Sequence, residues 1–149
     1  MLRPSKKLAL ALEAVVDIAH HGAAEPVQSQ DIGRRLHLPR RYLEQVMQQL
    51  VRAGILRGVR GPRGGYRLGR EKRRITVAEV VRVVQGNDPD EEAAVYGSEL
   101  GKRVMAPFWT DLEAAMMARL EAVTVEDLCT KAKSLAITSE SPSGADFAI

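Results

Sequence analysis

The sequence predicts a mainly α-helical fold with a small β wing, and three observations predict it. Residues 28–69 read as a short helix, a turn, a second helix and a hairpin whose tip is rich in Arg and Gly. Basic residues concentrate in the part of the chain that contains this pattern. A helix from about residue 107 carries an apolar stripe that a small winged domain does not need for its own core. Together they predict a winged helix-turn-helix DNA-binding domain followed by a long dimerisation helix.

The first predicted helix spans residues 5–21, with Ser5 as its N-cap. Ten of the twelve residues from position 8 to 19 are apolar, so most of the helix circumference is expected to be buried. Glu13 and Asp17 lie four residues apart on one side, and they are expected to mark the solvent-exposed edge.

The first helix of the helix-turn-helix follows a loop that ends at Val27. Ser29 is expected to cap this helix. Ile32 and Leu36 then face inward, while Arg34 and Arg35 face outward.

The second helix is the predicted recognition helix. Pro39 suits its first turn, because the missing N–H has no intrahelical partner there, and Gly54 suits the position after its end. One face carries a buried apolar stripe of Leu43, Val46, Met47, Leu50 and Val51. The opposite face offers donors of the kinds that read base edges and phosphates, with Glu44 acidic at its flank: Arg41, Gln45, Gln48 and Arg52.

Residues 55–59 and 66–68 can pair as the two strands of the wing. The connection between them is rich in Gly and Pro, and it carries Arg60 and Arg63 at the tip. A narrow basic tip has the shape and charge for a DNA minor groove. The alternative is an exposed turn whose arginines serve solubility. A phosphate-binding loop is not favoured, because neither GxxxxGK[ST] nor a βαβ context is present.

A charged connector at residues 70–74 leads into the next predicted helix. Thr76 and Glu79 have the spacing of a capping box, and this helix is expected to run to Gln85 and stop at Gly86. The winged domain is therefore expected to cover residues 1–86.

The rest of the chain divides into three predicted parts. Residues 87–106 form an acidic connecting loop with a short helical turn at 91–95, and residues 107–136 form the dimerisation helix and a second helix capped at Thr124. Residues 137–149 are polar, contain Pro and Gly, and are expected to be disordered. The residues expected at the dimer interface are Trp109, Leu112, Met116, Leu120 and Val123.

The formal charge of +3 hides an asymmetry between two parts of the chain. Residues 1–86 contain 17 basic and 7 acidic residues and carry +10, whereas residues 87–149 contain 5 and 12 and carry −7. A basic module suggests a polyanionic partner for the first part only. A solvated basic surface is the alternative.

Cysteine content and hydropathy point to a cytoplasmic protein. The chain has one cysteine, so no disulfide framework can form within it. The apolar run near the N-terminus is interrupted by Glu13 and Asp17 and has no cleavage site after it, so it does not read as a signal peptide. It is also shorter than the roughly 20 apolar residues that span a bilayer.

One long run resembles a known family: RRYLEQVMQQLVRAGILRGVRGPRGGYRLGREKRRITVAEVVRVVQG. Its YLEQ segment, RGPxGGYxL wing and ITxxEVVxxxxG helix resemble the Rrf2 family of bacterial winged-helix transcription regulators. The resemblance is strongest up to Gly86 and extends more weakly to about residue 135, through the Trp-containing helix and a closing TVEDL helix.

The resemblance implies a homodimer that binds a partly palindromic operator, usually as a repressor. It also implies that the recognition helix enters the major groove and that the wing arginine, here Arg60, enters the minor groove. Arg63 stands where some relatives have glycine, so its assignment depends on charge and position. The candidate DNA-binding residues are Ser29, Gln30, Arg40, Arg41, Tyr42, Glu44, Gln45, Gln48, Arg60 and Arg63.

The chain departs from the family members that sense through an iron–sulfur cluster. Those members have three cysteines between the capped helix and the dimerisation helix, and residues 87–108 here contain none. Because clusters need thiolates, no cluster, no other cofactor and no metal site are expected. Cys129 is interpreted as a small buried residue, with a thiol switch between subunits as the alternative. His20 and His21 point in different directions on a helix, so a shared metal is not expected.

Two other classes of function compete with DNA regulation. The chain could be an adaptor whose winged fold docks another protein, or a regulator whose DNA occupancy is set by a partner protein or a small metabolite. An enzyme is not favoured, because no nucleophile–base set and no metal-spaced cluster appears in the sequence.

Overall fold

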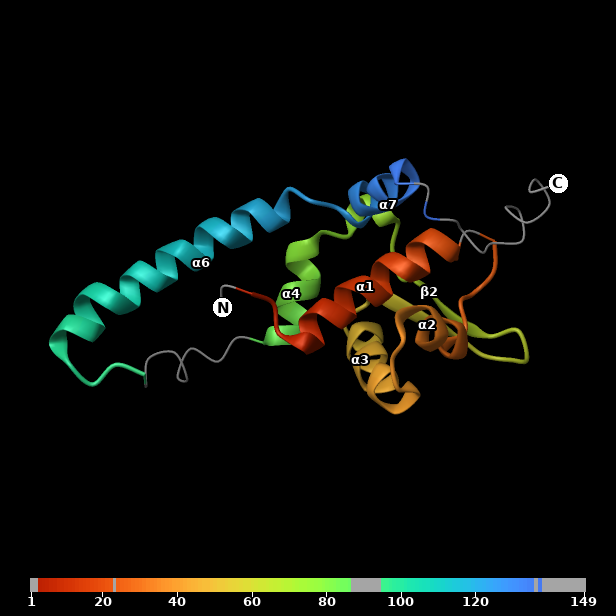
Figure 1. The fold of residues 1–149 in the computed structure, drawn as a ribbon, viewed down its shortest axis with the longest axis horizontal. Coiled ribbons are helices and arrows are strands. Elements are labelled where there is room, and N and C mark those ends of the chain that lie inside the picture. Colours follow the sequence, from red (N-terminus) through yellow and green to blue (C-terminus); the bar gives the residue numbers. More distant parts are fainter. Residues whose placement is uncertain (1–2, 23, 87–94, 136, 138–149) are drawn as a thin grey trace.

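The computed structural model shows a helical body, a two-stranded hairpin and one helix that extends away from the body (Figure 1). It describes residues 3–22, 24–86, 95–135 and 137. The mainly helical fold with a β wing is therefore confirmed. Its elements in chain order are α1 (Lys6–His21), α2 (Ser29–Leu36), α3 (Arg40–Arg52), β1 (Leu56–Val59), β2 (Gly65–Leu68), η1 (Lys72–Arg74), α4 (Val77–Gln85), η2 (Gly101–Met105), α6 (Ala106–Glu121) and α7 (Val125–Ser134).

Helix α1 is the centre of the body, and Ser5 caps it by accepting a hydrogen bond from the Leu8 N–H at 3.2 Å. It packs against α2, α3, α4, α7 and β2, which explains why apolar residues cover most of its circumference. The expectation that Asp17 marks a solvent-exposed edge is wrong, because this residue is buried. Glu13 is exposed as expected.

Asp17 is buried because it binds Arg35 of α2, which sequence reasoning placed outward. The Arg35 guanidinium donates to both carboxylate oxygens at 2.9 Å, and His21 lies 3.5 Å from the same carboxylate. Both side chains of the Asp17–Arg35 pair are largely excluded from solvent. A two-pronged bond of this kind fixes the angle between α1 and α2, and it could not be seen in a helical pattern alone.

The caps of the helix-turn-helix differ from the expected ones by one residue. Gln28, not Ser29, occupies the N-cap position of α2, and Ser29 already has helical backbone. Pro39 likewise occupies the N-cap position of α3 instead of its first turn. Gly54 lies just past the end of α3 with φ of 78°, as expected for a residue that ends a helix.

The hairpin is antiparallel, with Leu56 opposite Leu68 and Arg57 opposite Arg67. Leu56 is buried and Leu68 packs against the core, so the leucine pair marks the inner face of the hairpin. The next residues along each strand alternate in direction, which places Arg57 and Arg67 together on the outer face.

Helices α4 and α7 begin at one short β-bridge between Thr76 and Thr124. The Val77 N–H donates to the Val123 carbonyl and the Val125 N–H donates to the Ile75 carbonyl, both at 2.9 Å.

Each of these threonines caps its own helix. Thr76 accepts from the Glu79 N–H, while the Glu79 carboxylate binds Arg70, so only half of the predicted capping box forms. Thr124 and Asp127 form a complete box.

The extended helix starts earlier than the sequence pattern indicates. Residues 99–105 are already helical, with a π-helical turn at η2, so the loop expected to reach residue 106 is shorter than predicted. Tyr96 lies over Gly101, where an added Cβ would come within 2.6 Å of the ring. The expected turn at 91–95 and the expected tail at 137–149 fall almost wholly outside the described residues, which include Val95 and Ile137 but not 91–94 or 138–149.

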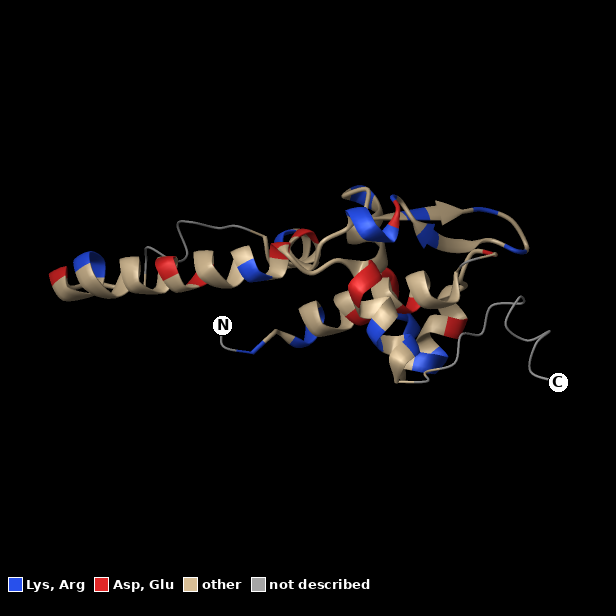
Figure 2. Cartoon of the chain, turned by 90° about the horizontal axis from the view of Figure 1, so that it is seen from above, with Lys and Arg blue, Asp and Glu red and all other residues tan. Residues whose placement is uncertain are grey.

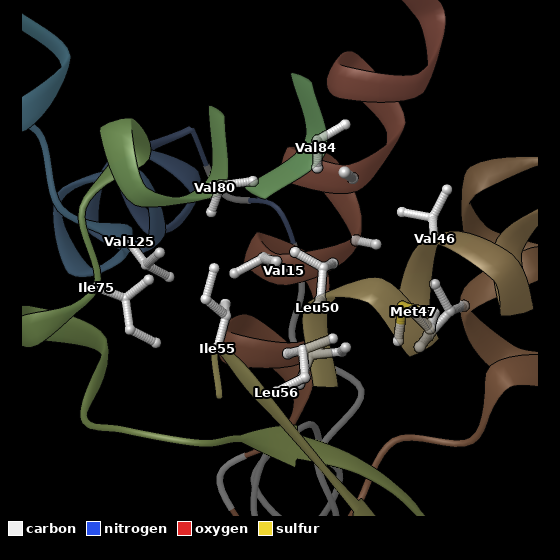
Figure 3. Packing of buried hydrophobic residues seen from close by; sticks show 14 of the residues in the cluster. Val15, Val46, Met47, Leu50, Ile55, Leu56, Ile75, Val80, Val84 and Val125 are labelled. Carbon is white, nitrogen blue, oxygen red and sulfur yellow. The ribbon is translucent and has the colours of Figure 1, made fainter. Parts of the chain in front are cut away.

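The core lies where α1, α3, α4, α7 and the base of the hairpin meet (Figure 3). Ile55, Ile75 and Val80 have 1% of their surface exposed or less, and Leu50 and Met47 of α3 enter the same cluster. The recognition helix is therefore held from behind by the centre of the fold, and its other side remains free for contacts.

Candidate DNA-binding surface

Helix α3 presents a polar face to solvent because its apolar stripe is used by the core. Leu43, Val46, Met47 and Leu50 are buried, and Val51 packs partly against them. The residues on the other side are exposed as the helical spacing predicts, namely Arg40, Arg41, Gln45, Gln48 and Arg52. Tyr42 differs from them, because its ring packs partly against the core.

Arg40 and Glu44 form an ion pair one helical turn apart, with 3.0 Å between Nε and Oε1. Both side chains are well exposed, so the pair adds little stability. Tyr66 of β2 is close enough for both charges of this pair to affect its pKa. Partial burial, together with the Glu44 carboxylate, raises the pKa of Tyr66, and the Arg40 guanidinium lowers it. The start of the recognition helix and the wing are therefore close enough for their charges to interact.

The wing is also attached to the helix-turn-helix through its backbone. The Val27 N–H donates to the Tyr66 carbonyl at 2.9 Å, and the Tyr66 N–H donates to the Val27 carbonyl at 2.8 Å. Gly65 permits this approach, since a Cβ there would lie 2.4 Å from the Val27 carbonyl oxygen. Sequence reasoning missed the role of Val27 and Tyr66. The Gly-Gly-Tyr run was the available signal, because paired glycines mark places where backbone segments come close.

The hairpin tip holds Arg60 and Arg63 in solvent at the far end of the wing. Gly61 has φ of 111°, and a Cβ at Gly64 would lie 2.2 Å from the Val59 carbonyl oxygen. The tip is narrow because these glycines allow a turn that other residues would strain. The tip is also the end of the hairpin that lies farthest from α1 (Figure 1).

The remaining candidate residues lie at the start of α2. Gln30 is exposed and Ser29 is half-buried, and both occupy the first turn of the helix. The N–H groups of a helix N-terminus and the associated positive partial charge suit a backbone phosphate.

One polar residue on α3 does not face solvent. The Gln49 side-chain amide donates to the Val83 carbonyl at 3.0 Å, near the end of α4. This bond joins the recognition helix to the helix that precedes the 87–94 segment, and no helical pattern distinguished Gln49 from its neighbour Gln48.

Cys129, the single cysteine of the chain, is 1% exposed in the core and lies near the Val16 carbonyl. Burial raises the pKa of its thiol more than the nearby charges of Lys72 and Lys133 lower it. Iron–sulfur clusters are held mainly by several cysteine thiolates, and the sequence offers one cysteine, so the residues present do not fit a cluster. Among the described residues, no group of three or more His, Cys, Asp and Glu could hold a metal ion.

The apolar stripe of α6 is divided between the core and solvent. Leu120 and Val123 pack against the body of their own chain, which contradicts the expectation that the whole stripe lacks an internal partner. Trp109 and Leu112 are 42% and 40% exposed. Sequence reasoning missed three further exposed apolar residues on the same extended segment: Leu100, Val104 and Phe108.

None of the described helices is both long and apolar enough to cross a membrane.

A helix-turn-helix, a basic hairpin beside it and a polar exposed face on its second helix define the winged helix-turn-helix class of DNA-binding proteins. Residues 4–131 match the Rrf2 family, described as iron-dependent transcriptional regulators, and the chain belongs to this family. It is a transcriptional regulator with DNA as its partner, and its relatives are regulators and not enzymes.

Two relatives illustrate the similarity in sequence. The chain is 35% identical to the HTH-type transcriptional regulator IscR of Xenorhabdus nematophila over 129 residues, which cover 85% of this chain and 79% of the relative. It is 33% identical to IscR of Photorhabdus laumondii over the same length and the same shares of the two chains.

Two solved structures share the fold. CymR, the global cysteine regulator of B. subtilis, has a TM-score of 0.70 and 30% identity, covering 88% of this chain and 98% of that chain. IscR of T. potens has a TM-score of 0.73 and 29% identity, covering 92% and 93%.

Proposed function

We propose that this protein is a homodimeric, sequence-specific repressor that binds a partly palindromic operator without an iron–sulfur cluster. The observation that carries the proposal is the joint presentation of two DNA-reading features. One is the exposed polar face of α3 and the other is the hairpin tip with Arg60, and the Val27–Tyr66 bridge fixes the wing to the segment that begins the helix-turn-helix. This arrangement suits a protein that reads adjacent major and minor grooves at once.

In the proposed complex, α3 enters the major groove. Arg41, Gln45 and Gln48 have the donor and acceptor groups that distinguish base edges. Arg40, Ser29 and Gln30 are placed to contact phosphates, which position the protein without reading sequence. Glu44 reduces the local positive charge, and an acidic group there disfavours contacts with phosphate oxygens.

A second copy of the chain completes the proposed regulator. One helix-turn-helix makes few base contacts, so two are needed at a spacing of about 34 Å along the duplex. The exposed apolar residues of α6 supply a surface on which a second copy can pack. Contiguous exposed apolar surface is uncommon in monomers and typically marks a protein–protein interface. Phe108 and Trp109 form an edge-to-face ring pair on this surface.

A cluster-free mechanism is supported by the position of Cys129, described above. Because its thiol is buried and its pKa raised, we expect slow reaction with thiol reagents in the folded protein. Occupancy of DNA would then depend on a metabolite or a partner protein. The proposed location is the cytoplasm, where the DNA partner is found.

The adaptor hypothesis differs from this proposal in one measurable respect. Genome-wide recovery of DNA bound by the protein, followed by footprinting of the recovered sites, should reveal protection of a defined palindrome with two half-sites. An adaptor would show no shared motif and no footprint.

Protein purified without oxygen should also be colourless, and visible absorption with matching iron and sulfide would contradict the absence of a cluster.

A further inference from the structure

We infer that Arg57 and Arg67 form a phosphate clamp at the rim of the minor groove that the wing tip enters. This inference deepens the proposed function and depends on it. It concerns residues on the strands of the wing, which neither the helical patterns nor the tip motif marks as DNA contacts.

The first observation is a like-charge pair in the hairpin. Arg57 of β1 lies directly opposite Arg67 of β2, so both side chains project from the same face. Like charges directly opposite one another destabilise an antiparallel pair. The leucine pair beside them faces the core, which leaves the arginines on the outer face of the hairpin. An arginine pair that lowers the stability of the free protein has a physical reason if a bound polyanion neutralises its two charges.

The second observation is the surrounding charge. Residues 57–74 contain eight basic residues and one acidic residue, a formal charge of +7. Figure 2 shows Lys and Arg along both strands of the hairpin and at its tip. The one acidic residue, Glu71, is bound to Arg73, which together with Arg74 lowers the pKa of this carboxyl group. The hairpin itself, residues 56–68, has four basic residues and no acidic one, so it is positive from its base to its tip.

The third observation is the length of the strand between the tip and the arginine pair. Arg57 precedes Arg60 by three residues, which at about 3.3 Å per residue corresponds to roughly 10 Å. The minor groove is about 7.5 Å deep. When the Arg60 side chain enters the groove, the backbone of Arg57 and Arg67 lies at or above the level of the groove rim, and their long side chains can reach the phosphates there.

The geometry of Arg67 suits this role. Its guanidinium donates one hydrogen bond to the Ala24 carbonyl at 3.2 Å, which restrains the side chain beside the start of the helix-turn-helix. A guanidinium has five N–H donors, so others remain available for a phosphate oxygen. Arg57 is exposed next to it.

The test measures the salt dependence of binding to a duplex that carries the operator, selected with the full-length protein from random-sequence DNA. In Arg57→Gln/Arg67→Gln, the slope of log affinity against log salt should fall by about 1.8, since each lost phosphate contact removes about 0.9. Affinity should drop about tenfold at 0.2 M salt, while the base preferences stay unchanged. The melting temperature should change little, because the variant removes both the repulsion between the two arginines and the Arg67 hydrogen bond to Ala24.

Two further variants sharpen the test. Arg57→Lys/Arg67→Lys keeps both charges and should retain most of the slope, since lysine also binds phosphate as a point charge. Lys131→Gln/Lys133→Gln removes the same charge from exposed positions on α7 and should leave the slope unchanged.

The inference is overturned if the glutamine variant keeps the wild-type slope, or if the α7 control loses as much. Lost regulation in cells with unchanged DNA binding would also overturn it, and would assign the pair to an acidic protein surface. If the selection itself yields no motif with the wild-type protein, the proposed function fails. A wild-type motif with an unaffected clamp variant rejects only the clamp.

Discussion

At the scale of single residues, the same residue type has different roles in this protein. Arg60 and Arg63 stand in solvent at the wing tip, while Arg35 is held in the interior by Asp17. Whether an arginine is exposed or buried depends on the element packed against it, not on its position within its own helix or strand. This exposure decides the effect of a substitution, because an exposed arginine can be removed without disturbing the fold.

Arg60→Ala should weaken operator binding by at least about 1 kcal/mol without affecting the melting temperature. The guanidinium is expected to respond to the strong negative potential of a narrow A·T-rich minor groove. Titrations with operators carrying A·T or G·C pairs at that position would show whether the preference for A·T falls. Arg63→Ala serves as the matched tip control, and it should reduce affinity with no change in this preference. Unchanged affinity of Arg60→Ala at moderate salt would remove the wing from the site.

Asp17→Asn should lower the free energy of unfolding by about 3–5 kcal/mol, because the buried Arg35 guanidinium loses its counter-charge. Urea denaturation followed by circular dichroism measures this difference. The exposed pair Arg34 and Asp31, 3.9 Å apart, provides the control, and Asp31→Asn should cost less than about 1 kcal/mol. Equal costs for the two variants would show that burial of the Asp17 pair has no special effect.

At the scale of elements, each helix has its polar and apolar faces assigned by what packs against it. In α3 the apolar face meets the core, and Gln45 and Gln48 remain exposed while Gln49 binds the end of α4. Helices α4 and α7 share one β-bridge at their N-termini. Helix α4 therefore contacts the recognition helix through Gln49 on one side, and on the other it binds the C-terminal end of α6 through Arg82 and Glu121.

Gln45→Ala should change the preferred base pair at one position of each half-site, because Gln45 is exposed near the start of α3 where base edges are in reach. Binding competition across single-base operator variants measures the preference. Gln49→Ala is the matched control on the same helix. It should lower stability by about 1 kcal/mol through the lost hydrogen bond to Val83 and leave base preference as it is. A uniform loss across all operator variants for Gln45→Ala would make it a phosphate contact.

At the scale of the whole molecule, α6 divides into an anchored end and a free end. Leu120 and Val123 pack against the body, and Arg82 of α4 binds Glu121 at 2.8 Å. The other end extends from the body with Phe108 and Leu112 exposed (Figure 1). The proposed dimer uses the free end, whereas the residues of the anchored end belong to the core of their own subunit.

Phe108→Asp/Leu112→Asp should give folded monomers that no longer bind the operator specifically. Sedimentation and circular dichroism test the oligomeric state and the fold together. Leu120→Asp should instead lower stability, since it places a charge against the core of its own subunit. A dimer that persists in the double variant, with full operator affinity, would reject this face of α6 as the subunit interface.

Local patterns in the sequence determined the elements and their order. Apolar content identified α1, apolar spacing identified α3, and the Thr76–Glu79 pattern identified α4. The glycine-rich tip identified the hairpin, and Thr124 was correctly identified as the cap of α7. The exposed side of α3 also followed from spacing. These features depend on neighbours within a few residues, because helix period, turn geometry and capping are set by short-range backbone and side-chain contacts.

The features that join distant segments depend on how the elements pack together. The Asp17–Arg35 pair, the Val27–Tyr66 bridge and the Thr76–Thr124 bridge each connect residues that are far apart in the chain. The division of the α6 stripe between core and solvent has the same origin. A pattern shows that a face is apolar or charged, but it does not show which other surface meets it. That choice depends on how all the elements pack at once, since burial and hydrogen bonding are satisfied for the whole fold together.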